Sequence, residues 1–114
     1  MAQAYNGTID QGADWYLTAV YKDSSGTPIN LTGYTAALQL REVAASTTAV
    51  LSLTTGSGIT ITGATGTIQV QATATQTRAI AAGTYFYDLE ITSSGGIVTR
   101  LIQGTQVVSA EVTR

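Results

Sequence analysis

Histidine and cysteine are both absent from this sequence of 114 residues. Without cysteine there is no disulfide framework and no thiol chemistry, which fits a reducing compartment or a particle that needs no redox link. Without histidine the usual general base, the commonest metal-binding side chain and every Ser-His triad are missing. Nucleophilic catalysis would need Ser, Thr or a carboxylate activated by one of only five basic residues. We therefore predict a protein that is not an enzyme and has no catalytic, cofactor-binding or metal-binding residues.

Charge is scarce as well. Charged residues make up 11% of the chain, against about 25% in ordinary globular domains. The net charge of −2 provides no basic field to hold phosphates, so nucleic-acid binding is not expected. Thr, Ser, Gln and Gly take the place of ions, and neutral groups are buried against a partner at lower cost. An all-β domain also favours Thr because it is β-branched, so the composition leaves both a docking surface and an ordinary strand surface open.

Long apolar runs and a secretion signal are also lacking. No apolar stretch approaches the roughly 20 residues of a membrane span, and no basic region followed by an apolar run opens the chain. The sequence therefore predicts a protein made in the cytoplasm and not inserted in a membrane. The length suffices for one hydrophobic core, so residues 1–114 are expected to form a single domain.

The clearest pattern that is present lies between Gly83 and Ile91. Tyr85, Tyr87, Leu89 and Ile91 alternate with Phe86, Asp88 and Glu90, which is typical of a half-buried strand with the first set inward. The preceding residues 79–83 together with Tyr85 resemble the corner of an immunoglobulin-like sandwich. In that corner a Tyr near the start of a strand donates a hydrogen bond to the backbone a few residues upstream.

Similar alternation predicts seven further strands separated by turn residues. In the second of them Trp15, Leu17, Ala19 and Tyr21 are placed inward. The seven are residues 4–9, 14–22, 34–41, 50–54, 59–61, 67–72 and 97–110, the last with a kink or bulge at Gly104.

The turns and one short helix complete the expected fold. The glycines of 56–58 and 63–66 predict hairpin turns, because neither group is followed by a helix and a Lys as in a phosphate loop. One short helical turn is expected near residues 74–81, with a Thr at its N-cap, as the crossover between two sheets. Residues 42–48 are expected to form a loop. The predicted fold class is all-β, an immunoglobulin-like β-sandwich of about seven to nine short antiparallel strands.

Two acidic pairs were considered as chemical sites. Asp10 and Asp14 flank a Gly-containing loop and could share a calcium ion, but a turn with Asx-type hydrogen bonds is the preferred interpretation. Asp88 and Glu90 share one strand face, and we expect them to face solvent or to pair with Arg100 or Arg41.

Four aromatic residues were considered as a sugar-binding platform. They are Tyr5, Trp15, Tyr16 and Phe86. The preferred interpretation places Trp15 in the core and scatters the other three over the surface.

A combination of motifs resembles small proteins of tailed bacteriophages, similar to the immunoglobulin-like N-terminal domain of phage upper-baseplate proteins. The resemblance covers nearly the whole chain. Its motifs are residues 9–15 (IDQGADW), 30–34 (NLTGY), Leu40-Arg41, Thr77, Gly83 with Tyr85 and 87–89 (YDL), 99–102 (TRLI) with Gly104, and 111–114 (EVTR), together with Asp23, Gly26 and Pro28. The relatives continue into a coiled coil or receptor-binding module, whereas this sequence stops at Arg114. The resemblance implies a domain attached to a virion.

Three functions follow as expectations. The first is a non-enzymatic capsid cement or decoration protein that binds phage coat subunits in many copies. The second is an attachment protein of the neck, tail or baseplate, and the third is a stand-alone carbohydrate-binding or adhesive β-sandwich. The first two predict a virion protein made in the host cytoplasm, with phage structural proteins as partners. The protein-binding residues are expected to be Tyr5, Tyr16, Phe86 and Arg114.

Overall fold

The computed structural model describes residues 3–43 and 48–112, and within them the chain is mostly β-structure. This confirms the predicted dominance of strands. The loop predicted at 42–48 falls partly on residues 44–47, which lie outside the described residues. The elements are β1 (Gln3–Ala4), β2 (Gly7–Asp10), β3 (Trp15–Val20), β4 (Thr35–Arg41), β5 (Leu51–Thr55), β6 (Gly58–Thr62), η1 (Gly63–Thr65), β7 (Thr67–Ala72), α1 (Ala74–Arg78), β8 (Gly83–Thr92) and β9 (Val98–Ser109).

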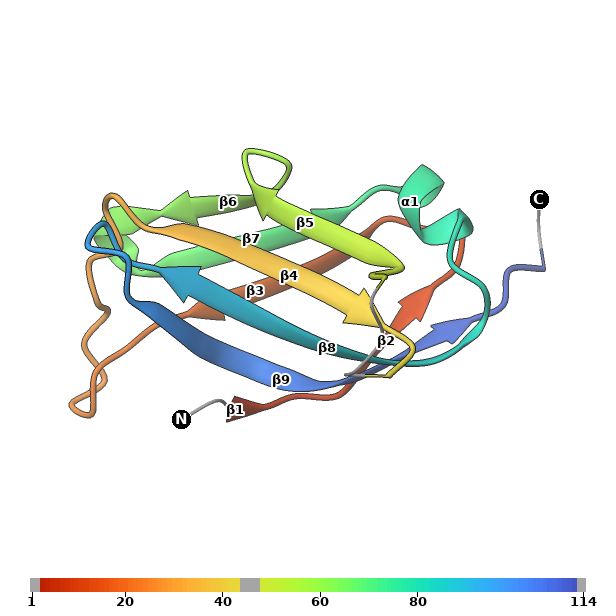
Figure 1. The fold of residues 1–114 in the computed structure, drawn as a ribbon, viewed down its shortest axis with the longest axis horizontal. Helices are drawn as coiled ribbons and strands as arrows, with labels where there is room; N and C mark the ends of the chain where they lie inside the picture. Colours follow the sequence, from red (N-terminus) through yellow and green to blue (C-terminus); the bar gives the residue numbers. More distant parts are fainter. Residues whose placement is uncertain (1–2, 44–47, 113–114) are drawn as a thin grey trace.

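All these strands are hydrogen-bonded into one curled, mixed sheet. The strand order is β1-β9-β8-β4-β5-β6-β7-β3, and β2 also pairs with β9. The sheet curls so that β3 and β7 lie behind β4 and β8 (Figure 1). The prediction of antiparallel strands alone is wrong, because β1 and β2 run parallel to β9. Helix α1 connects β7 to β8, and these strands belong to one continuous sheet within the described residues.

The predicted hairpin between residues 50–54 and 59–61 is also wrong. Strand β6 continues in the direction of β5 after a small loop, and their short pairing at Thr54 and Gly58 is parallel (Figure 1). Gly56 and Gly58 have φ values of 84° and 100°, which only glycine adopts readily. The loop carries the chain from its contact with β4 to its contact with β7. The second predicted hairpin is confirmed, since β6 and β7 are antiparallel around η1.

The core lies between the two halves of the curled sheet and follows the predicted alternation. Leu38 and Leu40 of β4 are fully buried and lie opposite Leu89 and Tyr87 of β8. Trp15 is also buried, as predicted, with 8% of its surface exposed. The other buried apolar residues are Ile9, Leu31, Ala36, Leu51, Leu53, Ile59, Ile68, Val70, Ala72, Ile80, Tyr85, Ile91 and Val108. Burial of this set supplies the main favourable free energy of folding.

Strand β8 has the predicted corner at its start. The Tyr85 hydroxyl donates a hydrogen bond of 2.6 Å to the carbonyl oxygen of Ala81, four residues upstream. This contact confirms the expected hydrogen bond. Phe86, Asp88 and Glu90 lie on the opposite, outer face, also as predicted.

Strand β9 does not break at Gly104. It is continuous from Val98 to Ser109, and its irregularity lies at Leu101, because Leu89 pairs with Ile102 whereas Glu90 pairs with Arg100. A bulge inserts one unpaired residue, which changes the alternation of side chains. As a result Leu101 and Ile102 line the same groove although they are consecutive. The expected position of the bulge was therefore wrong by three residues.

Gly104 has a different role in β9. A Cβ atom there would lie 2.2 Å from the carbonyl oxygen of Tyr5 and 2.6 Å from Oδ1 of Asn6. The absence of a side chain lets the N-terminal segment approach β9. The predicted first strand, 4–9, is accordingly divided into β1 and β2 at Tyr5 and Asn6, where Asn6 Oδ1 accepts a 2.9 Å hydrogen bond from the Thr105 amide.

Helix α1 is shorter than predicted and begins at Ala74. Its N-cap is Thr73, whose hydroxyl accepts from the Gln76 amide while the Gln76 side chain accepts from the Thr73 amide. This reciprocal capping box satisfies two otherwise free backbone donors. Asp14 Oδ1 accepts a further 2.7 Å hydrogen bond from the Ala74 amide, so the end of one loop fixes the start of the helix.

Candidate functional site

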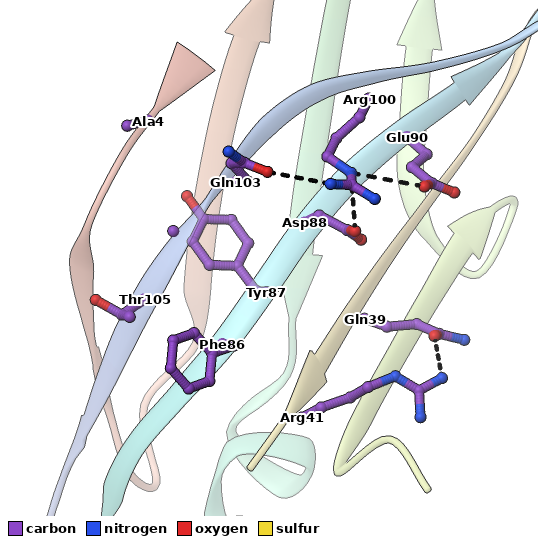
Figure 2. Close-up of a pocket in the computed structure, with 11 residues that line it drawn as sticks. Ala4, Gln39, Arg41, Phe86, Tyr87, Asp88, Glu90, Arg100, Gln103 and Thr105 are labelled. Carbon is purple, nitrogen blue, oxygen red and sulfur yellow. Dashed lines mark hydrogen bonds and ion pairs between the residues drawn. The ribbon is translucent and has the colours of Figure 1, made fainter. Parts of the chain in front are cut away.

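One candidate surface is the outer face of β4, β8 and β9, called here the β8 face. Strand register aligns Arg41, Phe86 and Thr105 in one row. A second row across the same strands contains Gln39, Asp88 and Gln103. These residues, with Glu90 and Arg100, line an open depression of ≈ 520 Å³ (Figure 2).

Phe86 is the aromatic residue of the β8 face. Its side chain is 46% exposed, although a large apolar group is normally buried. Its register neighbour on β4 is Arg41, whose Nη2 donates 2.6 Å to Oε1 of Gln39. An exposed aromatic ring beside an oriented guanidinium and two amide side chains suits contact with a polar, uncharged partner surface.

The charges of the β8 face compensate one another. Arg100 Nε lies 3.3 Å from Oδ2 of Asp88 and 3.9 Å from Oε2 of Glu90, and Arg100 Nη1 donates to Gln103 (Figure 2). The predicted pairing of the two carboxylates with Arg100 is confirmed. All three side chains are partly exposed, so these ion pairs add little stability. They place one cation between two carboxylates, so the local charges largely compensate.

A second candidate surface lies between β3 and the N-terminal edge of the sheet. This β3 groove has a volume of ≈ 650 Å³. Its lining includes Tyr5 on one side, Tyr16 on the other, and Leu101 and Ile102 of the β9 bulge. The rest of the lining is formed by Gln3 and by residues 17–22, which include most of β3 and the two residues that follow it. Lys22 is the only charged residue among the described residues of this lining. The groove is therefore mainly apolar and neutral.

The predicted binding residues are divided between the two surfaces. Tyr5 and Tyr16, 49% and 64% exposed, both line the β3 groove. Phe86 lines the β8 face and is not part of the groove. Arg114 lies outside the described residues. The three described aromatic side chains are thus divided between two surfaces, and Trp15 is in the core, so the residues proposed as one sugar platform do not share one face.

The loop between Asp10 and Asp14 serves the fold. The Asp10 carbonyl accepts from the Ala13 amide to form the turn, and Asp14 caps α1. Thr77 of α1 is fully buried, and its hydroxyl accepts from the Gly12 amide and donates to the Ala13 carbonyl. The turn is confirmed, with a backbone carbonyl in place of the expected Asx contact at Asp10.

Helix α1 is joined to the C-terminal segment by an ion pair. Arg78 contacts Glu111 through Nε to Oε1 at 3.1 Å and Nη2 to Oε2 at 3.2 Å. The hydrogen bond and the negative charge of Glu111 raise the pKa of the Arg78 guanidinium. Gln11 donates to the Ile80 carbonyl and accepts from the Glu111 amide. Several motif residues that carried the phage resemblance are therefore ones that connect elements of this fold.

Two buried polar side chains lie near the N-terminal edge. The Tyr87 hydroxyl donates 2.7 Å to the Tyr5 carbonyl, and burial raises the pKa of Tyr87. The Gln106 amide partly offsets this rise in the pKa of Tyr87, although neither of its polar atoms makes a hydrogen bond with a described residue. Gln106 is fully buried, and neither Nε2 nor Oε1 has a hydrogen-bond partner among the described residues.

Sequence reasoning missed some residues of both surfaces. Gln39, Arg41 and Gln103 become neighbours of Phe86 only through strand register. The sequence suggests Arg41 as an ion-pair partner and as part of the Leu40-Arg41 motif, but not as a surface neighbour of Phe86. The alternating polar positions of residues 34–41 are the signal that could have identified Gln39 and Arg41. Leu101 and Ile102 were missed in the groove because the bulge that turns both toward it has no local sequence signal.

Comparison with known proteins gives no match to this chain, either among protein-family models or among curated proteins. Across residues 3–43 and 48–112, no group of three or more His, Cys, Asp or Glu side chains is arranged to hold a metal ion. In the same part of the chain, no helix has the length and apolar character needed to cross a membrane.

Proposed function

We propose that this protein is a non-enzymatic structural protein of a bacteriophage virion, a capsid cement or decoration protein that binds coat subunits. The observation that carries the proposal is the β8 face, where a half-exposed Phe86 lies in a depression in which Asp88 and Glu90 both pair with Arg100 and Arg41 donates to Gln39. Such a surface loses little solvation energy on docking compared with one carrying free ions. The resemblance of the sequence to phage virion domains supports the choice of partner.

The fold can be assigned more narrowly than as a mostly β structure. We assign the curled sheet to an immunoglobulin-like β-sandwich formed as a single domain. The Tyr85 hydrogen bond to the Ala81 carbonyl supports this assignment, as does a core shared by residues from β4 and β8 on one side and β3 and β7 on the other. An attachment role agrees with the fold, because two of its surfaces carry exposed aromatic side chains.

In this proposal Phe86 is the central contact and Arg41 its neighbour. Aromatic and Arg residues dominate the energetics of many protein interfaces, whereas surrounding polar residues mainly exclude water. At the edge of the β8 face, the ion pairs of Arg100 with Asp88 and Glu90 hold these three side chains in position. We expect particle binding to depend weakly on salt, because few unpaired ions are available for screening.

The copy number in purified particles tests the placement. Quantitative mass spectrometry should find hundreds of copies per particle for a cement protein that contacts coat subunits throughout the shell. About a dozen copies would instead favour the alternative, an attachment protein of the neck, tail or baseplate. Absence from purified particles would overturn the virion assignment.

A binding experiment tests the face. Particles lacking the protein are mixed with purified wild-type chain or with Phe86→Ala, and the bound amount is measured after sedimentation. Phe86→Ala should bind at least about tenfold more weakly, the size expected for a dominant interface residue. Ile97→Ala is the matched control, because Ile97 is an exposed apolar side chain that lines neither of the two candidate surfaces. Equal loss in both variants would contradict the assignment of the β8 face.

A carbohydrate-binding or adhesive role is the second candidate. It is favoured by the combination of Phe86 with planar polar side chains, Gln39, Arg41 and Gln103, in one open depression. Binding of the isolated chain to a glycan array, lost in Phe86→Ala, would support it over the virion role. No binding on the array, together with incorporation into particles, would exclude it.

A further inference from the structure

Within residues 3–43 and 48–112 no strand pairs with the outer edge of β3, which borders the β3 groove. β3 is the last strand of the sheet and pairs with β7 over six consecutive residues without a bulge. Proteins usually protect such edges with Pro, bulges or charged side chains within the strand, and Trp15–Val20 contains none of these. The opposite edge is different, because β1 and β2 are short and are separated at Tyr5 and Asn6. β3 is therefore the edge suited to adding another strand.

The direction of the backbone groups on β3 follows from its pairing. The Tyr21 amide donates 2.8 Å to the Gly66 carbonyl, on the side of β7. Because backbone groups alternate sides along an antiparallel strand, residues 15, 17 and 19 also direct theirs toward β7. The amide and carbonyl groups of Tyr16, Thr18 and Val20 then point to the free edge. The backbone groups of these three alternate residues are thus available to pair with another strand.

We propose that this edge pairs with the same edge of a second copy of the chain, antiparallel and centred on Thr18. In this register Lys22 of one copy lies opposite Asp14 of the other, and the pair occurs twice by symmetry. Both side chains are exposed, and among the described residues Lys22 has no ion-pair partner in its own chain. Asp14 Oδ1 also accepts the Ala74 amide, so Lys22 would add a cation to a carboxylate that is already held in place. This charge complementarity favours a second copy as the occupant, in this register.

The remaining cross-strand pairs agree with the same register. Thr18 lies opposite Thr18, and Tyr16 lies opposite Val20, so a hydroxyl pair and two aromatic–aliphatic pairs form on the outer face. On the inner face Leu17 lies opposite Ala19, and both are only partly buried in the single chain because the sheet ends there. Shifting the pairing by two residues in either direction while keeping the symmetry leaves Lys22 without a carboxylate opposite. The inference does not depend on the proposed virion function.

Sedimentation velocity and multi-angle light scattering of the purified chain test the pairing. We expect a concentration-dependent dimer, and Thr18→Lys should weaken it roughly tenfold or more, because two like charges then lie directly opposite each other. Thr60→Lys is the matched control, because Thr60 is also an exposed strand residue. Gln69 of β7 lies between the two positions, since it pairs with Thr18 of β3 on one side and with Thr60 of β6 on the other. It should dimerise like the wild-type chain.

Cross-linking tests the register, and the natural chain offers a cysteine-free background. Thr18→Cys should give a disulfide-linked dimer on mild oxidation, since directly opposed residues in such a pair have Cα atoms about 5.5 Å apart. Thr60→Cys should remain largely monomeric under the same conditions. A monomeric wild-type chain at millimolar concentration, or a dimer unaffected by Thr18→Lys, would overturn the proposal. Capture of a different chain by the β3 edge of a monomer would also overturn it.

Discussion

The hydroxyl of Tyr87 donates a 2.7 Å hydrogen bond to the carbonyl oxygen of Tyr5, 82 residues earlier in the chain. Tyr87 belongs to the core strand β8, and Tyr5 lies where β1 ends. Tyr87 pairs with Gly104 of β9, and the Tyr5 carbonyl can lie close to β9 there because Gly104 has no side chain. One core side chain thus holds the interrupted edge strand in place.

Tyr87→Phe should lower the free energy of unfolding by about 1 kcal/mol, because it removes one partly buried hydrogen bond while keeping the aromatic ring. Urea denaturation at neutral pH measures the change. Tyr16→Phe is the control, since Tyr16 is mostly exposed and, among the described residues, its hydroxyl accepts only a long, exposed contact of 3.4 Å from Nε2 of Gln71. Equal destabilisation of the two variants would contradict a specific role for the Tyr5 contact.

The same hydroxyl gives a prediction for alkaline pH. Burial raises the pKa of Tyr87 in the folded protein above the value of about 10 expected for an unfolded chain. The folded state therefore holds the proton more strongly, and this contribution to stability is fully present below about pH 10. It is lost as pH rises through the higher folded-state pKa. The wild-type chain should lose more stability above pH 10 than Tyr87→Phe, whereas parallel pH profiles would contradict the prediction.

Gly104→Ala should destabilise the fold by about 1–3 kcal/mol, because the new methyl group would collide with the Tyr5 carbonyl and Asn6 Oδ1. Amide hydrogen exchange should show the loss concentrated at β1 and β2. Gly95→Ala is a suitable control, since the nearest atom to its new Cβ is Ser93 Oγ at 3.8 Å. If both substitutions had the same small effect, the close approach at Gly104 would not constrain the edge.

Thr77→Val should cost about 1–2 kcal/mol, because it leaves the Gly12 amide and the Ala13 carbonyl without their shared hydroxyl partner. Thr77→Ser keeps the hydroxyl and should recover much of this loss. Thermal unfolding of the three chains makes the comparison. A valine variant as stable as the wild type would show that the loop does not need this contact.

Gln106→Met should leave stability unchanged or increase it. Both polar atoms of the Gln106 amide are buried without a hydrogen-bond partner, so a side chain of similar size and no such atoms removes a desolvation cost of about 1–3 kcal/mol. Gln103→Met, on the exposed face of the same strand, should have little effect. Marked destabilisation by Gln106→Met would indicate that the amide has a partner that its burial alone does not reveal.

Local patterns in the sequence predicted local structure well. The alternation from Tyr85 to Ile91 identified both faces of β8, and the same rule found β3, β4 and β7. Burial on one side of a sheet imposes a two-residue period, so this information is present in the sequence of each strand. The exposed positions of Tyr16 and Phe86 follow from the same period.

Relationships between distant segments were not predictable in this way. Nothing near Gln3 indicates that it pairs parallel to Ile102, and the glycines at 56 and 58 have the composition of a hairpin turn although the chain continues in one direction. The bulge at Leu101 contains no glycine. Both candidate surfaces depend on these relationships, since register brings Arg41 beside Phe86 and the bulge turns Leu101 toward Tyr16.

The parallel pairing of β1 and β2 with β9 has a consequence for folding during synthesis. Asn6 and Thr105, which are joined by a hydrogen bond, are 99 positions apart, and β9 is the final strand of the sheet in chain order. A chain that leaves the ribosome N-terminus first cannot pair its first two strands until nearly all of it has emerged. Because contacts of such long sequence separation form late and slowly, β1 and β2 should join last, onto a sheet already formed by β3 to β9.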